Sequence, residues 1–462
     1  MKVLLIAYDN ESEISFFPVG LAYIASSIRT GGYYVTIYNQ DVYHYPEEHL
    51  TQFLDDNNFD VIGVGACGGY FQYRKIMSIT NAIAKSKHTH FVVIGGHLVS
   101  SEPEYFLRKF HCSAICIGEG ERTIVDLLNA LQSGNSLKEV QGIAFLENDG
   151  FIQTEHRPVI QDLDEIPEPA YDLFPIDHYA LFPAVNAKST DRFMPVLSGR
   201  GCTFTCNFCY RMDKGFRPRP AESILREIAF LQKEYNITYI DFCDELLMSS
   251  EKRTLELCKS FIDSNLKFRW RCNGRLNFAK PEVLEYMKKS GCVFINYGIE
   301  SVDDVALRKM RKALTVEQII TGIENTLAVG ISPGLNIIFG NIGENQECLD
   351  KDVEFLLKYD DHAQLRTIRP VTPYPGSPLY DYAIKNGFIK NCEDFYENKH
   401  TNSDLLTVNF TDMTDDEFYA ALPKANKTLL YSYVEKLKQR NISLLDSLYV
   451  TLDKNFRGFR HT

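Results

Sequence analysis

The sequence predicts two successive α/β units: a doubly wound, Rossmann-like parallel-sheet domain over residues 1–135, and a partial, TIM-like (β/α)6 barrel over residues 191–395. Three observations lead to this fold class. Short β-branched runs alternate with helical patterns in both regions, and parallel strands need helical crossovers of this kind. Glycines end several strands of the first region, where a doubly wound sheet binds its ligands. The second region has about six strand–helix repeats, fewer than the eight of a closed barrel.

The first region is expected to contain five strands and three longer helices. The strands are expected at 3–7, 34–38, 61–65, 91–94 and 114–117, and the helices at 20–30, 73–85 and 122–131. Apolar residues, with valine and isoleucine prominent among them, fill most positions of these strands, which is typical of strands buried on both faces.

Residues 136–190 are expected to be a linker with a small hairpin, because Asn148-Asp149-Gly150 is a strong turn signal. Residues 396–462 are expected to be a mainly helical extension with a helix over 415–439. Between these segments the barrel strands are expected at 195–198, 237–242, 268–272, 293–298, 335–339 and 364–369, and its helices at 222–235, 250–264, 281–290, 304–312, 316–329 and 346–359.

Composition excludes several classes of protein. The 462 residues carry a formal net charge of −12, which argues against general binding of nucleic acid. The first apolar run is too short for a signal peptide and no run is long enough to span a membrane, so we expect a cytoplasmic protein. Twelve cysteines without a secretory signal favour metal binding over disulfides for any clustered set.

One group of cysteines has tight ligand spacing. Cys202, Cys206 and Cys209 form a C-x-x-x-C-x-x-C loop directly after the first expected barrel strand. Three thiolates can ligate three irons of a four-iron, four-sulfur cluster and leave the fourth iron open. A structural zinc site would need a fourth ligand, and the closest histidine is His178. The spacing therefore favours an iron–sulfur cluster.

This loop, in its position after the first strand of a β/α series, resembles the signature of the radical S-adenosylmethionine (SAM) superfamily. The resemblance implies that Cys202, Cys206 and Cys209 hold a 4Fe-4S cluster, and that SAM chelates the open iron and yields a 5′-deoxyadenosyl radical. It also implies SAM contacts from one residue of the loop and from later strand ends, namely Phe208, Asp244, Glu245, Arg275, Glu300 and Gly340. A carboxylate at a strand end can equally cap the next helix. Arg275 and Glu300 are favoured because both lie on the expected catalytic rim.

The first region lacks the G-x-G-x-x-G fingerprint of dinucleotide-binding domains after its first strand. It resembles instead the cobalamin-binding module that precedes many radical SAM barrels. The resemblance implies cobalamin contacts from Pro18, Gly20, Gly65, Tyr70, Gly95, Gly96, Glu119 and Gly120. The Asp-x-His-x-x-Gly motif that supplies a lower axial histidine is missing, so Tyr70, Phe71 or Gln72 could face the cobalt, with ordinary packing as the alternative. A module kept as a scaffold without cofactor is a further alternative.

Together the two resemblances imply a cobalamin-dependent radical SAM enzyme. The leading hypothesis is a methyltransferase that methylates an unactivated carbon, or phosphorus, of a small molecule or natural product through a 5′-deoxyadenosyl radical and methylcobalamin. The alternative is a rearrangement, ring contraction or oxidative cyclisation with the same cofactors. An external electron donor such as flavodoxin or ferredoxin is expected.

Two further alternatives receive less support from the sequence. A transfer-RNA methylthiotransferase would need additional amino-terminal cluster cysteines, and Cys67, Cys112 and Cys116 do not form such a set. A non-catalytic, cobalamin-responsive binding protein stays open at the level of sequence.

Overall fold

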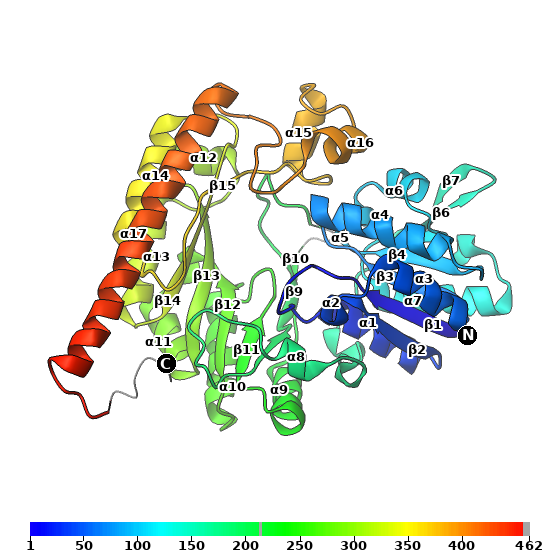
Figure 1. Cartoon of the computed structure of the whole chain (residues 1–462), viewed down its shortest axis with the longest axis horizontal. Helices are drawn as coiled ribbons and strands as arrows, with labels where there is room; N and C mark the ends of the chain where they lie inside the picture. The colour runs from blue at the N-terminus through cyan, green and yellow to red at the C-terminus, as the bar shows by residue number, and fades with distance from the viewer. Residues whose placement is uncertain (212–214, 456–462) are drawn as a thin grey trace.

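The computed structural model describes residues 1–211 and 215–455. Two sheets lie side by side, each covered by helices (Figure 1). The fold class expected from the sequence is confirmed. Within the described ranges, no helix combines the length and the apolar character that crossing a membrane requires.

The first sheet has seven strands in the order β2-β1-β3-β4-β5-β6-β7. The first five in this order are parallel. They are β1 (Lys2–Ala7), β2 (Tyr34–Asn39), β3 (Val61–Gly65), β4 (Phe91–Gly95) and β5 (Ala114–Cys116). The chain direction across the sheet reverses between β1 and β3, so the switch point that binds ligands in this architecture lies at their carboxyl ends.

The hairpin around residue 148 was expected in a separate linker but belongs to the first sheet. Strands β6 (Ile143–Glu147) and β7 (Gly150–Gln153) extend the first sheet, because β6 pairs antiparallel with β5. Without this pairing β5 would be an edge strand with unpaired backbone groups. The turn residues Asn148 and Asp149 have φ values of 49° and 63°, the left-handed conformation that a tight hairpin turn needs.

Helices cover both faces of the first sheet because its strands are apolar on both sides. In β1, Val3 and Leu5 face α1 (Val19–Thr30) and α7 (Gly120–Ser133), whereas Leu4 and Ile6 face the opposite core. The opposite face carries α3 (Glu47–Asp56) and α4 (Tyr70–Ala84). Three short helices complete this unit: α2 (Gln40–Tyr43), α5 (His97–Ser100) and α6 (Pro103–Lys109).

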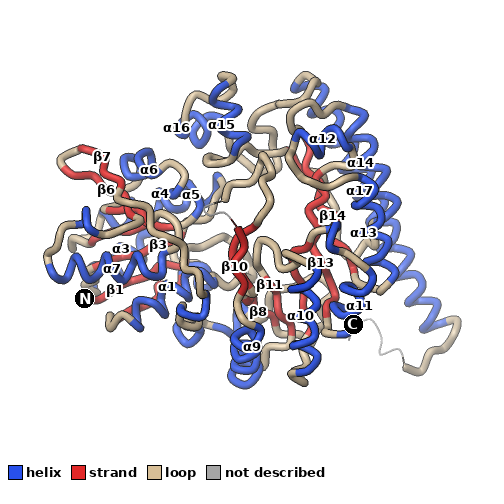
Figure 2. The backbone as a smooth tube through the Cα atoms, turned by 180° about the vertical axis from the view of Figure 1, so that it is seen from behind, coloured by secondary structure: helices blue, strands red, loops and turns tan. Residues whose placement is uncertain are grey.

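The second sheet has six parallel strands in the order β15-β14-β13-β12-β11-β8. Its curvature gives an open half-barrel with helices along its outer side (Figure 2). The strands are β8 (Phe193–Val196), β11 (Tyr239–Phe242), β12 (Arg269–Gly274), β13 (Cys292–Glu300), β14 (Ser332–Phe339) and β15 (Arg369–Pro370). The expected sixth strand, 364–369, is therefore reduced to a short pairing with β14.

The barrel helices follow the expected ranges. They are α9 (Ala221–Tyr235), α10 (Glu251–Asp263), α11 (Pro281–Lys289), α12 (Asp304–Lys309), α13 (Val316–Ala328) and α14 (Gln346–Tyr359), with the short α8 (Ile176–Tyr179) before the barrel. Polar side chains begin several of them; Thr315, for example, makes a capping box with Gln318 at α13.

The carboxyl-terminal region divides between the two units. The segment with α15 (Pro378–Lys385) and α16 (Cys392–Asp394) packs into the core of the first unit, where Tyr73 stacks on Tyr396. Helix α17 (Asp415–Tyr449) returns to the barrel and is longer than expected. Residues 456–462 of the expected extension lie outside the described residues.

Candidate active site between the two sheets

The cysteine loop begins in a hairpin that the sequence did not predict. After β8, strand β9 (Gly199–Cys202) pairs antiparallel with β10 (Gly215–Pro218), so Cys202 lies at a strand end. Gly201 has a φ of 87°, and a Cβ there would collide with the Gly215 carbonyl oxygen. The hairpin therefore requires glycine directly before the first cysteine.

Charged groups surround the other two cysteines. A hydrogen bond from Cys209, together with the nearby charges of Lys312 and Arg275, lowers the pKa of the Cys206 thiol to about 6 despite its burial. The same bond raises the pKa of Cys209. Cationic neighbours stabilise thiolates, the form that ligates iron. Among the described residues, no three Cys, His, Asp or Glu side chains converge on a single-ion site. A cluster does not need such convergence, since each thiolate binds a different iron.

Asn207, between the cysteines, is a residue that the sequence analysis missed. Its side-chain amide exchanges two hydrogen bonds of 3.0 Å with that of Asn341, after β14. Its backbone N–H donates to the Met310 carbonyl (2.9 Å), and its carbonyl accepts from Leu379 N–H (2.8 Å). Asn207 thus ties the loop to three other parts of the fold. The signal that identifies Asn207 is its pairing with Asn341, and this pairing is not visible in the sequence because the two residues are far apart in the chain.

Three of the residues expected to contact SAM lie around Lys312, which the sequence analysis also missed. Glu300 accepts a 2.8 Å ion-pair bond from Lys312 Nζ, and this nitrogen lies 5.9 Å from the centre of the Phe208 ring. The Arg275 guanidinium stacks at 3.5 Å on the ring of Phe204 and donates to the carbonyls of Lys312 and Ala313. Glu300 has a φ of 70° at a register shift in β13, which turns it away from the regular strand path.

Two of the remaining expected SAM residues, Asp244 and Glu245, support backbone segments of the rim. Asp244 is fully buried and accepts bonds from the Ser198 N–H (2.6 Å) and hydroxyl; burial raises its pKa to about 6. Glu245 accepts from Gly201 N–H at 2.8 Å. Gly340 has a φ of 106° after β14. Both carboxylates therefore hold the start of the cysteine loop.

The residues expected to bind cobalamin gather at the carboxyl edge of the first sheet. Gly65 and Gly95 end β3 and β4, and Gly120 begins α7 after β5. Pro18 precedes α1, in which Gly20 is the second residue. A Cβ on Gly20 would meet no heavy atom within 4 Å, so this edge leaves open space where the family resemblance expects a corrin.

Two of the residues expected to bind cobalamin, Gly96 and Tyr70, lie in close contact with other protein groups. Gly96 has a φ of 112°, and a Cβ there would collide with the Ala66 carbonyl oxygen. The Tyr70 hydroxyl accepts a 2.9 Å bond from Arg74, and the Tyr70 ring makes an edge contact with His400. These contacts fix the loops after β3 and β4.

Glu119 links the two units. Arg200 in β9 donates to its carboxylate at 2.9 Å, Arg217 in β10 donates at 3.0 Å, and Ile160 N–H donates at 2.7 Å. Arg200 also donates to Glu121 at 2.5 Å. Despite its burial, the pKa of Glu119 is lowered by Arg217, by Ile160 N–H and by Arg200. The carboxyl edge of the first sheet, where Gly65 and Gly95 end their strands (the glycine edge), is thus joined to the hairpin whose first strand ends at Cys202.

A second contact joins the cysteine loop to the glycine edge of the first sheet. The ring of Tyr210, which follows Cys209, makes an edge contact with the ring of His97, which follows Gly96, at a centroid distance of 5.6 Å. Gly376, in the proline-rich turn before α15, leaves room for the Tyr210 ring. The last cysteine of the loop and the glycine edge therefore lie next to each other.

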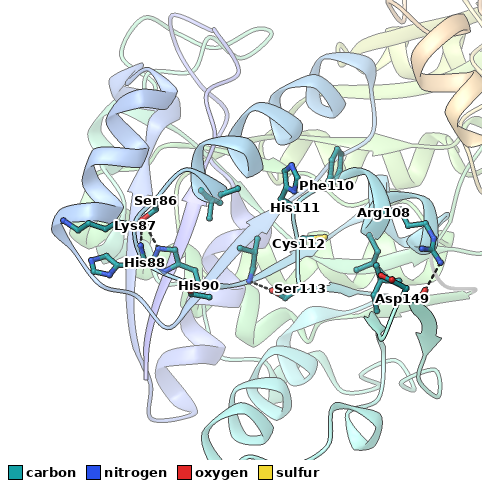
Figure 3. Close-up of a pocket in the computed structure, with 16 residues that line it drawn as sticks. Ser86, Lys87, His88, His90, Arg108, Phe110, His111, Cys112, Ser113 and Asp149 are labelled. Atoms are coloured by element: carbon teal, nitrogen blue, oxygen red, sulfur yellow. Dashed lines mark hydrogen bonds between the residues drawn. The ribbon is translucent and has the colours of Figure 1, made fainter.

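One hollow of about 690 Å³ lies away from these edges. It is formed at the amino ends of β4 and β5, where His90 and Ser113 precede the strands, and His88, His111 and Cys112 also line it (Figure 3). The hollow is therefore at the opposite end of the first sheet from the glycine edge, and we assign it no part in the site.

The half-barrel with its cysteine loop and the glycine-edged parallel sheet together define a radical SAM enzyme with a cobalamin-binding domain. A profile of the radical SAM superfamily matches residues 196–356, and a profile of the B12 binding domain matches residues 8–128. The chain belongs to the cobalamin-binding radical SAM enzymes. Membership implies a 4Fe-4S cluster, SAM and cobalamin as cofactors.

Its relatives include enzymes named for different reactions. An uncharacterized methyltransferase of Pyrococcus horikoshii is 31% identical over 401 residues, which cover 84% of each chain. The anaerobic magnesium-protoporphyrin IX monomethyl ester cyclase of Rubrivivax gelatinosus is 25% identical over 79% of this chain and 65% of its own. Among solved structures, the radical SAM methyltransferase TsrM of Kitasatospora setae is similar with a TM-score of 0.69 and 16% identity, over 83% of this chain and 78% of that one.

Proposed function

We propose that this protein is a cobalamin-dependent radical SAM methyltransferase that methylates an unactivated carbon, or phosphorus, of a small molecule. The observation that carries the proposal is the contact of Tyr210 with His97, because it brings the end of the cysteine loop beside the glycine edge. A substrate bound between these edges would face both cofactors. When bound, the cluster supplies the electron that cleaves SAM and cobalamin supplies the methyl group.

The proposed roles of the residues follow from their contacts. Cys202, Cys206 and Cys209 would hold the cluster, with Lys312 and Arg275 offsetting its negative charge. Phe208, Glu300 and Gly340 would border SAM. Asp244 and Glu245 would act on SAM only by holding Ser198 and Gly201, the backbone that precedes the first cysteine.

On the cobalamin side, the glycines would allow the backbone to approach a flat ring. We propose that Pro18, Gly20, Gly65, Gly95 and Gly120 border the corrin. Tyr70 and Gly96 would shape the loops below it, and Glu119 would position the hairpin. Enclosure between the two units would keep a reactive carbon radical away from solvent. A flavodoxin or ferredoxin would deliver the electron.

Isotope transfer tests the proposal. The anaerobically reconstituted enzyme is incubated with SAM carrying a trideuterated methyl group, a reductant and a candidate substrate. We expect a product three mass units above its unlabelled methylated form, together with 5′-deoxyadenosine and S-adenosylhomocysteine. The Cys206→Ala variant should give neither labelled product nor deoxyadenosine, whereas Cys258→Ala, a buried thiol in the barrel core, should retain both. Deoxyadenosine formed with a product that carries no label would overturn methyl transfer.

That last outcome would favour the second candidate. The relation to a protein named as a cyclase supports a rearrangement or oxidative ring closure with the same cofactors. In such a reaction deoxyadenosine forms, the substrate is converted without gaining a methyl group, and S-adenosylhomocysteine does not accumulate with turnover. Product mass therefore separates the two candidates.

A further inference from the structure

Helix α17 continues well beyond the part that packs on the barrel. Phe418, Leu422, Ala425 and Leu429 are buried in the barrel core. After Leu429 the helix extends as far as Tyr449, and all of its side chains there are half-buried or exposed. Figure 1 shows this end projecting past the neighbouring helices. The projecting end carries no side chain of the site described above.

The projecting end has a regular apolar stripe. Leu430, Val434, Leu437, Asn441, Leu444 and Leu448 follow one another at alternating spacings of four and three residues. This spacing puts all six on one face of a helix and is the a/d pattern of a coiled coil. Leu430, Val434 and Leu437 are each more than 40% exposed, although apolar side chains of this size are usually buried.

The residue types at these positions indicate what covers the stripe. The β-branched Val434 occupies an a position, and Leu430, Leu437 and Leu444 occupy d positions, which favours two parallel strands. Leu448 occupies the last a position. Asn441 occupies the middle a position. Against a lipid surface or a purely apolar partner its amide would lose its hydrogen bonds, which is costly. Two Asn441 side chains facing each other across a parallel pair would satisfy each other.

We propose that the projecting half of α17 forms a parallel, two-stranded coiled coil with α17 of a second copy of this chain. In this arrangement Lys438 lies beside Tyr433 of the second copy, and Arg440 lies beside its Leu445, so no like charges meet along the flanks. An antiparallel pair would instead place Asn441 against leucine. A stripe this short would form a weak coiled coil between isolated peptides, because each peptide would first have to nucleate a helix. Here the helix is already formed by its packing on the barrel, so that cost does not arise.

Light scattering after size exclusion tests the proposal on the full chain, purified anaerobically with its cofactors. The expected mass is twice the 52.9 kDa of one chain. Leu437→Glu buries two charges in the pair and should weaken dimerisation at least tenfold. Lys436→Glu lies on the polar face of the same helix and should leave the dimer intact. Far-ultraviolet circular dichroism verifies that both variants are folded.

A cross-link tests the parallel register separately. Asn441→Cys should form an interchain disulfide on oxidation, because the two sulfurs face each other, and Lys436→Cys should not. A chain that is monomeric at all concentrations, or a dimer that persists unchanged in Leu437→Glu, would overturn the proposal. A monomer that cosediments with phosphatidylglycerol vesicles through this stripe would assign the stripe to a membrane surface and would also overturn it.

Discussion

Glu119, at the carboxyl edge of the amino-terminal sheet, accepts a 2.9 Å hydrogen bond from Arg200, two residues before the first cysteine of the loop. Both side chains are largely buried, with 9% and 18% of their surfaces exposed. An ion pair of this kind is sensitive to the loss of one partner, because the remaining charge stays buried. The position of the two units relative to each other therefore depends on a few buried charged side chains.

Replacement of Arg200 should therefore destabilise the junction. We expect Arg200→Met to cost about 3 kcal/mol of stability, since Glu119 and Glu121 lose a shared cation. The matched control is Arg29→Met, which breaks an ion pair with Asp172 whose side chains are 46% and 59% exposed, and should cost less than about 1 kcal/mol. Thermal unfolding of the two variants measures the difference. Equal shifts in midpoint would show that the buried Arg200 pair does not stabilise the junction more than an exposed ion pair does.

The paired amides of Asn207 and Asn341 should determine how well the cysteine loop is held. Asn207→Ala leaves the buried Asn341 amide without its partner, at a cost of about 1–3 kcal/mol. We expect the variant to stay folded but to retain less iron and sulfide after reconstitution and desalting. Asn57→Ala, at an exposed site, should retain the wild-type amounts. Full iron retention in Asn207→Ala would show that the loop does not depend on this pair.

Glu344 should make stability depend on pH. It is fully buried and accepts from the N–H groups of Gly340 and Asn341, and burial raises its pKa from 4.5 to about 7. The folded protein thus holds a proton that the unfolded chain releases above pH 4.5. Its contribution to stability is present at low pH and decreases as pH rises from 4.5 to about 7. Glu344→Gln keeps the acceptor without the charge, so its thermal midpoint should fall less over this range. An unchanged pH dependence would show that Glu344 does not titrate there.

The open space at Gly20 should be needed for cobalamin. Gly20 is exposed, has an ordinary helical backbone, and would accept a Cβ without collision. Gly20→Phe should therefore fold but fill the space proposed for the corrin. We expect less cobalt per chain after reconstitution, and loss of the cobalamin absorption bands. Gln132→Phe, exposed near the far end of the α7 helix, is the control. Cobalamin retention equal to that of the control would contradict the proposed position of the corrin.

Local patterns in the sequence were sufficient for most of the fold. Unbroken apolar strands and amphipathic helices predict both parallel sheets, and the three cysteines predict the kind of cofactor. The β9–β10 hairpin escaped prediction because its strands are short and rich in glycine and arginine, without alternating apolar residues. The position of the β6–β7 hairpin was not predicted, because a turn signal indicates that a hairpin forms but not which strand of a sheet it pairs with.

The site was less predictable than the fold because its side chains contact partners far away in the chain. The sequence predicts Glu119 at the corrin but gives no sign of its bonds to Arg200 and Arg217, which span the two units. Lys312 lies after a barrel helix and has no motif, but it joins Glu300 and Phe208. Contacts of this type depend on tertiary packing, which no local pattern reports.

Electron paramagnetic resonance of the reduced protein tests whether the three cysteines hold a cluster that binds SAM. We expect a signal of a reduced 4Fe-4S cluster that changes when SAM is added, because SAM would bind the iron that Cys202, Cys206 and Cys209 leave open. The Cys206→Ala variant should show a strongly diminished signal and no change with SAM. A wild-type signal that does not change with SAM, or a signal that survives unchanged in Cys206→Ala, would contradict a SAM-binding cluster held by these three cysteines.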